Sequence, residues 1–298
     1  MAVTFMQQES AGAFLEPNEA GAIAVCALTD AHEAEALAFL AARPVHTVFM
    51  ATLIRDNGLI SPLNRGTFYG CRAARGRLTG LALIGHATII ETADDAALAV
   101  FARLAQNCPT AYLIRGEQER VARFWQHYES RGRRPRRMCR ELLLEQRPPV
   151  AVLEAVRGLR PATCEDLRLI IEVNARMIAD ECGVNPLERD PVGFRVRLLR
   201  RIEQGRVWVW VRDGRLMFKT DVLADTSAAF YLEGVWVHPE ERGRGHGLRC
   251  LSQLSRLLLQ RTETVCLVVN ETAAAAQNFY RKAGYKTTAR YDTIYLHT

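Results

Sequence analysis

A glycine-rich loop between two apolar segments constrains the fold of this chain most strongly. Residues 242–247 have the sequence RGRGHG and are called the glycine loop. The β-branched and aromatic segment 230–237 before it is typical of a strand, which His238-Pro239 ends. Leucines at steps of three and four after it predict an amphipathic helix. Alternating glycines at a helix start leave backbone N–H groups free at the positive end of the dipole, so the loop predicts an anion site.

The spacing of the glycines excludes two nucleotide-binding motifs. A P-loop needs Gly-Lys-Ser/Thr at the helix start, and a dinucleotide-binding turn needs two residues between its second and third glycines. The glycine loop has neither feature. Arg-Gly repeats also occur in RNA-contacting tails and in tight turns, but the flanking strand and helix favour the anion site.

Length and composition indicate a globular protein with room for two domains. The chain has 298 residues, of which 49% are hydrophobic and 24% are charged, as is usual for folded proteins. We find neither a signal peptide nor a membrane-spanning segment, so we expect a cytoplasmic protein without membrane contact. The 8 cysteines lie singly, and no histidine pair has metal-ligand spacing. We therefore expect reduced cysteines and no metal.

The net charge of +6 comes from arginine, with the densest cluster between residues 131 and 140. Such a cluster is one kind of nucleic-acid contact. Here it contains Gly132 and Pro135 and separates a predicted helix from a predicted strand, which favours a solvated loop. We do not expect a nucleic-acid partner.

The first half predicts helices, three strands, a helix, a strand, a helix and a final strand. Thr29-Asp30 resembles a helix cap, and Asp94-Asp95 opens a later helix. The predicted helices cover 30–43, 45–55, 95–104 and 117–129, and the predicted strands cover 67–73, 77–84, 87–91, 111–115 and 138–144.

A proline pair at 148–149 forms a stiff joint, where we place a domain boundary. Residues 1–148 are called the N-terminal half and residues 149–298 the C-terminal half. The second half predicts a strand at 157–161, helices at 163–177 and 190–202, a hairpin of 207–212 with 215–223, the strand at 230–237, a strand at 265–269, a helix at 272–282 and a strand at 286–295. Both halves share one element order, which suggests duplication of one mixed α/β fold.

The halves differ where the glycine loop lies. The N-terminal half has Thr92-Ala93-Asp94-Asp95 at the corresponding position. Carboxylates at a helix start satisfy the dipole themselves and repel phosphate. We therefore expect an anion site only in the C-terminal half.

Two motifs resemble those of the GNAT superfamily of N-acetyltransferases. Arg242-x-x-Gly245-x-Gly247 matches its coenzyme A loop, and the sequence Asn278 to Tyr285 matches its second signature, in which a tyrosine precedes Gly-aromatic by four residues. The resemblance covers the chain from about Arg157 to its end. Over most of its length the chain also resembles two-domain members whose N-terminal domain is degenerate. One position departs from the family pattern, because Ala273 stands where many members have asparagine.

The resemblance implies tandem GNAT-like domains, each a central mixed, mainly antiparallel sheet flanked by helices. It implies acetyl-CoA as a substrate, with the active site in the C-terminal half and the N-terminal half as a wall or lid. We then expect one coenzyme A per chain, and a C-terminal half that keeps the site when it is produced alone. The implied cofactor residues are Val235, Trp236, Val237, Arg242, Gly243, Arg244, Gly245, His246, Gly247, Leu248 and Asn270.

The implied reaction is direct attack of a primary amine on the thioester. Tyr280 would protonate the departing sulfur, with a packed core tyrosine as the alternative. Glu233 is the predicted base, because it shares a strand face with Val235, and Glu181 is the alternative base. The identity of the amine, the acyl chain length and the oligomeric state stay open. A non-catalytic acyl-CoA sensor or partner-binding protein is the alternative function, supported by Ala273 and the unsettled base.

Overall fold

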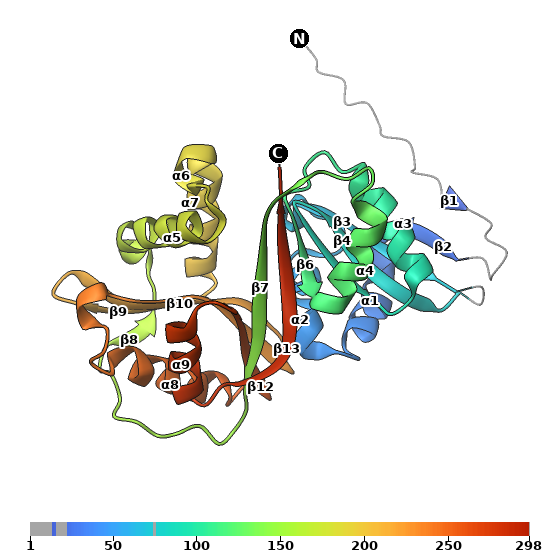
Figure 1. The fold of residues 1–298 in the computed structure, drawn as a ribbon. Helices are drawn as coiled ribbons and strands as arrows, with labels where there is room; N and C mark the ends of the chain where they lie inside the picture. Colours follow the sequence, from blue (N-terminus) through green and yellow to red (C-terminus); the bar gives the residue numbers. More distant parts are fainter. Residues whose placement is uncertain (1–13, 16–22, 74–75, 298) are drawn as a thin grey trace, which may run out of the picture.

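The strands of both halves form one continuous sheet. The computed structural model describes residues 14–15, 23–73 and 76–297. Their strands form a 13-stranded sheet in the order β1-β2-β3-β4-β5-β6-β13-β7-β12-β11-β10-β9-β8 (Figure 1). Among the described strands, only β5 with β6 and β11 with β12 pair in parallel. The predicted mixed, mainly antiparallel sheet flanked by helices is confirmed.

The N-terminal half follows the predicted order closely. Its helical segments are η1 (Asp30–His32), α1 (Glu33–Leu40), α2 (Pro44–Asn57), η2 (Pro62–Asn64), α3 (Asp95–Gln106) and α4 (Gln118–Tyr128). Its strands are β1 (Phe14–Leu15), β2 (Ala24–Ala27), β3 (Gly66–Arg72), β4 (Leu78–Gly85), β5 (Ala87–Thr92), β6 (Leu113–Glu117) and β7 (Pro135–Gln146). Asp94 caps α3 by accepting a hydrogen bond from the Ala96 N–H at 2.9 Å, as its sequence predicts.

The C-terminal half repeats the same order of elements. Its helical segments are η3 (Cys164–Asp166), α5 (Leu167–Cys182), α6 (Pro186–Arg189), α7 (Pro191–Glu203), η4 (Pro239–Glu241), α8 (His246–Leu258) and α9 (Ala274–Lys282). Its strands are β8 (Leu159–Pro161), β9 (Val207–Arg212), β10 (Arg215–Asp225), β11 (Ala229–Val237), β12 (Thr264–Asn270) and β13 (Lys286–Leu296). Asp213 and Gly214 both have positive φ in the β9–β10 turn, which is the geometry of a type I′ hairpin.

The two halves exchange their last strands. β7, from the N-terminal half, pairs with β12 and β13 of the C-terminal half. β13 in turn pairs with β6 of the N-terminal half. Figure 1 shows β7 and β13 side by side at the centre of the molecule. Each half therefore supplies a strand to the sheet of the other.

Helix α2 of the N-terminal half packs against the C-terminal half. Its buried Val48 shares a cluster with Ala224 of β10 and Tyr231 of β11. The Thr52 hydroxyl accepts a hydrogen bond from the Asp225 N–H at 2.9 Å. This contact brings β6 and β11, which are distant in the strand order, to the same region of the molecule.

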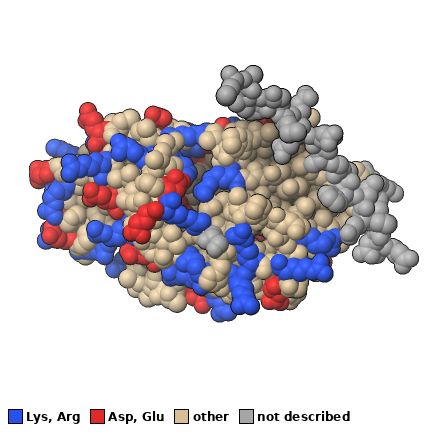
Figure 2. All heavy atoms as spheres, turned by 90° about the horizontal axis from the view of Figure 1, so that it is seen from above, with Lys and Arg blue, Asp and Glu red and all other residues tan. Residues whose placement is uncertain are grey.

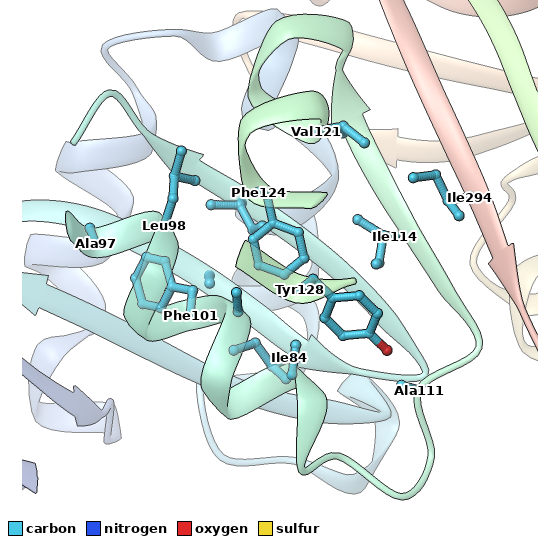
Figure 3. Packing of buried hydrophobic residues seen from close by; sticks show 14 of the residues in the cluster. Ile84, Ala97, Leu98, Phe101, Ala111, Ile114, Val121, Phe124, Tyr128 and Ile294 are labelled. Atoms are coloured by element: carbon cyan, nitrogen blue, oxygen red, sulfur yellow. The ribbon is translucent and has the colours of Figure 1, made fainter. Parts of the chain in front are cut away.

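The helices α3 and α4 cover one face of the N-terminal part of the sheet. Phe101 of α3 and Phe124 of α4 are fully buried, and they pack with Ile84 of β4 and Ile114 of β6 (Figure 3). Ile294 of β13 belongs to the same cluster. The exchanged strand thus also contributes to the N-terminal core.

The arginine cluster at 131–140 is only partly the predicted loop. Arg131, Arg133 and Arg134 precede β7, but Arg136, Arg137 and Arg140 lie within it. The strand begins earlier than predicted because Pro135 starts it opposite Leu296. Figure 2 shows basic side chains spread over both halves on the face it draws, with acidic side chains between them. Among the described residues, no helix is long and apolar enough to cross a membrane.

Candidate active site

The strands β11 and β12 diverge and leave one edge of β11 unpaired. Their parallel pairing ends at Tyr231 opposite Cys266, although β11 continues to Val237. On its other side, β11 remains paired with β10 up to Val237. Within the described part of the chain, residues 232–237 therefore have a free edge, which another extended chain can pair with. The predicted residues Val235, Trp236 and Val237 all lie on it.

A β-bulge interrupts this edge strand at Gly234. Glu233 pairs with Asp221 and Trp236 with Lys219, so two residues of β11 face one residue of β10. Gly234 has a φ of +61°, and a Cβ added there would lie 2.9 Å from Lys219 Nζ. The bulge re-aims the backbone groups next to it, and only glycine fits its conformation and the space.

The glycine loop presents free backbone donors at the start of α8. The N–H groups of residues 243–248 donate to no acceptor within the described residues. Gly245 is the N-cap with a φ of +79°, and no side chain caps the helix. No described atom lies within 4 Å of a Cβ added at Gly243 or Gly245. The loop therefore has backbone donors, the positive end of a helix dipole and open space, which together suit an anion.

The third glycine of the loop has a packing role. A Cβ added at Gly247 would lie 2.6 Å from Val237 Cγ2, so Gly247 lets α8 approach β11. Leu248, next to it, packs with the core beneath the helix.

Buried Glu241 organises the side chains of the glycine loop. It pairs with Arg212 at 2.8 Å, Arg244 at 3.4 Å and His246 at 3.3 Å. Arg242 instead donates from Nε to the Val237 carbonyl at 3.2 Å. Sequence reasoning missed Glu241, because only the fold shows that it faces inward.

Tyr280 lies on α9 in the core beneath the diverging strands. It shares a cluster with Leu232 of β11 and Val269 of β12, and it is 9% exposed. Within the described residues its hydroxyl has no hydrogen-bond partner. Burial raises the pKa of Tyr280, so the hydroxyl keeps its proton at neutral pH.

Asn270 ends β12 and begins the turn before α9. Its Oδ1 accepts hydrogen bonds from the Thr272 N–H at 2.9 Å and hydroxyl at 2.7 Å. Ala273 is the N-cap of α9 and provides no side-chain cap. The amide Nδ2 of Asn270 has no acceptor among the described residues and can serve a ligand.

Three glutamates from different elements form what we call the carboxylate cluster: Glu141 of β7, Glu181 of α5 and Glu233 of β11. Glu181 is exposed to solvent as a residue, although neighbouring protein atoms partly bury its carboxyl group. This burial, with the charges of Glu233 and Glu141, raises its pKa to about 7, and the neighbouring Tyr295 hydroxyl opposes the rise. Glu181 therefore titrates near neutral pH, as a general base needs.

The N-terminal half supplies Arg115 and Glu141 to this region. Arg115 donates to the Tyr231 hydroxyl at 2.8 Å and lies 3.6 Å from Glu141. The Thr293 hydroxyl donates to Glu141 at 2.7 Å. Sequence reasoning missed both residues, because it assigned β6 and β7 to a separate domain. The described residues contain no group of three or more His, Cys, Asp or Glu side chains placed to hold a metal ion.

A family model matches part of the C-terminal half. Residues 203–287 match the family model described as acetyltransferase (GNAT) domain. This segment contains the diverging strands, the glycine loop and Tyr280. A search of curated proteins finds no match to the chain.

Solved structures with this fold match nearly the whole chain. A GNAT-family acetyltransferase from Colwellia psychrerythraea has a TM-score of 0.54 and 14% identity, with 92% of this chain and 99% of that chain covered. A GCN5-related N-acetyltransferase from Sphaerobacter thermophilus has a TM-score of 0.57 and 15% identity, with 92% and 95% covered. A tandem GNAT protein from the clavulanic acid biosynthesis pathway has a TM-score of 0.56 and 14% identity, with 93% and 99% covered. The chain therefore has the tandem GNAT fold that its two motifs predict.

Proposed function

We propose that this chain is an N-acetyltransferase that moves an acetyl group from acetyl-CoA to a primary amine. One observation supports the proposal above others. The unpaired edge of residues 232–237 leads to the free N–H groups of residues 243–248. The pantetheine arm of coenzyme A can pair with the unpaired edge as an added strand. Its pyrophosphate can accept hydrogen bonds from the free N–H groups.

The chemistry that we propose is direct transfer without an acyl-enzyme. The amine nitrogen bonds to the thioester carbon, the carbon–sulfur bond breaks, and the sulfur leaves with the bonding electrons. Tyr280 donates its proton to that sulfur, since burial keeps the hydroxyl protonated. A carboxylate takes the proton that the amine nitrogen must lose.

We propose the pair Glu181 and Glu233 as the site of proton removal. Glu233 lies on β11 one residue before the bulge at Gly234 and has no ion-pair partner among the described residues. The pKa of Glu181, about 7, suits it better to accept a proton at neutral pH. The charge of Glu233 helps to set that pKa, so both carboxylates contribute even when one of them moves the proton.

The alternative is a non-catalytic acyl-CoA sensor. One specific observation favours it, which is that Ala273 stands where many members of the resembled family have an asparagine. The measurement that separates the two is release of free thiol from acetyl-CoA in the presence of a library of primary amines. Sustained release that depends on an amine supports the transferase. Tight binding of acetyl-CoA without amine-dependent release by any library member would support the sensor.

A further inference from the structure

A group of arginines lies between the two halves, away from the glycine loop. Arg189 of α6 lies with its guanidinium carbon 4.8 Å from the centre of the Tyr112 ring. On β7, Arg136 donates to the Tyr112 hydroxyl at 3.4 Å. The His86 ring stacks on the Tyr112 ring, with 4.8 Å between the ring centres. The backbone N–H of His86 donates to the backbone carbonyl of Arg65 at 2.8 Å. We call Arg65, Arg136 and Arg189 the interlobe arginines.

These three arginines differ from arginines such as Arg43 and Arg120, which pair with carboxylates. Among the described residues, no carboxylate lies within ion-pair distance of any of them. Arg197, their neighbour on α7, pairs with Asp190 at 2.9 Å. Arg65 and Arg189 are exposed to solvent, and Arg136 is partly exposed. Positive charge is thus gathered without neutralisation at a place that solutes can reach.

The titration of the neighbouring groups agrees with this excess of positive charge. Burial, followed by the charges of Arg65, Arg189 and Arg197, lowers the pKa of His86 to about 4. Burial and the charges of Arg197 and Arg189 also lower the pKa of Arg65, although Asp190 opposes them. An anion bound here would relieve the repulsion.

The interlobe arginines are linked to the carboxylate cluster through Tyr295. Its ring lies 5.8 Å from the guanidinium carbon of Arg136, and its hydroxyl is near enough to the Glu181 carboxyl group to oppose the rise in the pKa of that group. Tyr295, Tyr112 and Cys182 pack in one buried cluster. The region between the halves therefore has a carboxylate end and an arginine end, with Tyr295 between them.

We propose that the interlobe arginines bind an anionic group of the acceptor, so that the acceptor is a primary amine that also carries a carboxylate or a phosphate. This inference rests on the proposed function. The amine end lies at Glu181 and Glu233, and the anionic end lies at Arg136 and Arg189. Arginine suits this role because its fixed fork matches carboxylate and phosphate oxygens.

The test compares amines that differ only in the anionic group. The first arm sets ω-amino carboxylates, from β-alanine to 6-aminohexanoate, against alkylamines of equal length. The second arm sets O-phosphoethanolamine against ethanolamine. A charge-assisted hydrogen bond contributes about 10-fold or more. We expect kcat/KM to favour the anionic amine by at least about that factor at one chain length, and the arm that shows it identifies the anion.

Variants of the arginines then locate the effect. Arg136→Gln and Arg189→Gln should each reduce the preference by about 10-fold. Arg131→Gln, an exposed change of equal charge before β7, should preserve the preference. Equal rates for anionic and neutral amines in the parent would overturn the proposal. So would an equal loss of preference in Arg131→Gln, since that would indicate long-range charge only.

A binding measurement separates this proposal from the acetyl-transfer reaction. Protein saturated with coenzyme A is titrated calorimetrically with succinate and with inorganic sulfate, so that the glycine loop is already filled. Binding that is weakened in Arg189→Gln supports the anion site even when no amine is acetylated. Turnover of neutral amines, with no anion binding in the parent, would leave the proposed function in place and reject the anion site.

Discussion

Each half contains a pair of parallel strands that diverges. Side chains bridge the gap between these strands in the N-terminal half but not in the C-terminal half. In the N-terminal half, Glu91 of β5 and Glu117 of β6 face each other across it, and Arg43 and Arg120 each pair with both glutamates. No ion pair between described residues bridges β11 and β12. The same backbone arrangement thus contains an ion network in the N-terminal half and has unpaired strand edges in the C-terminal half.

The ion network is close and partly buried. Arg43 lies 3.1 Å from Glu91 and 2.7 Å from Glu117, and Arg120 lies 2.7 Å and 3.1 Å from the same carboxylates. By strand register, Glu91 corresponds to Glu233, because each lies two residues beyond the last paired residue of its strand. The C-terminal half lacks the two arginines, so its glutamate stays available.

The helix that follows each gap shows the same contrast. Asp94 fills the start of α3 with its own carboxylate, whereas no side chain caps α8 after Gly245. A helix start accepts one negative group, either internal or external. Under the proposed function, the side chains and not the path of the backbone decide which half binds coenzyme A.

The largest effect should come from separating the halves. The sequence predicted an independent C-terminal half, but residues 149–298 lack β7, which lies between β12 and β13. Without it, both strands lose a partner and β12 exposes a hydrophobic edge. We expect the segment 149–298 alone to give no cooperative unfolding transition and no binding of coenzyme A. Residues 135–298, which restore β7, are the matched control. A folded, binding-competent 149–298 segment would show that β7 is dispensable.

The next largest effect should come from the glycine loop. Gly245→Val places a β-branched side chain at a φ of +79° and in the space left for the anion. We expect calorimetric titration to show coenzyme A affinity reduced by about 100-fold or more, the equivalent of roughly two charge-assisted hydrogen bonds. Gly76→Val is the control in the N-terminal half, because Gly76 has a φ of +77° and equally open surroundings. The prediction is wrong when Gly245→Val and Gly76→Val both bind coenzyme A with the parental affinity.

Most of the fold could be predicted from the sequence because its local signals agree with the tertiary structure. Asp94 and Asp190 cap the helices where they were expected, and Asp213-Gly214 forms the hairpin turn. The strand β2 (Ala24–Ala27) was missed, since its run of small apolar residues has no alternation that distinguishes strand from helix.

The strand exchange could not be predicted, and the missed site residues follow from it. Local sequence patterns predict a strand after α4 whether that strand stays in the N-terminal half or is exchanged. Only packing decides that β7 pairs with β12. Arg115 and Glu141 therefore looked like residues of a separate domain. The glycine loop could be singled out because its motif is contiguous, whereas the proposed acceptor region is assembled from both halves.

The third effect concerns the chemistry that we propose for the C-terminal half. Tyr280→Phe keeps the ring and its packing but removes the hydroxyl. A positioned general acid is worth about 10² to 10⁴ in rate, and a thiolate is a tolerable leaving group, so we expect kcat to fall by about 100-fold. The affinity for acetyl-CoA should change little, which calorimetry checks. Parental turnover in this variant, with chemistry limiting the rate, would assign Tyr280 to packing.

A smaller effect should appear in the pH dependence. Glu181 must be ionised to accept a proton, and its pKa is about 7. We therefore expect kcat/KM to fall by about tenfold for each pH unit below that value and to level off above it. Glu181→Gln should lower the rate and remove this limb, whereas Glu233→Gln should shift it to lower pH, because the charge of Glu233 raises the pKa of Glu181. If the decline of kcat/KM at low pH persists in Glu181→Gln and vanishes in Glu233→Gln, Glu233 is the base.

The smallest effect on the cofactor should come from the N-terminal ion network. Glu91→Ala leaves Arg43 and Arg120 with Glu117 alone, and breaking this partly buried network should lower the free energy of unfolding by about 2 kcal/mol, which denaturant unfolding measures. Asp95→Asn, which disrupts an exposed pair with Arg123, should cost less than about 1 kcal/mol. Both variants should still bind one coenzyme A per chain with parental affinity, because Asp94 continues to occupy the start of α3. A second bound coenzyme A in Glu91→Ala would mean that the ion network alone, and not the capped helix, keeps the N-terminal gap closed to the cofactor.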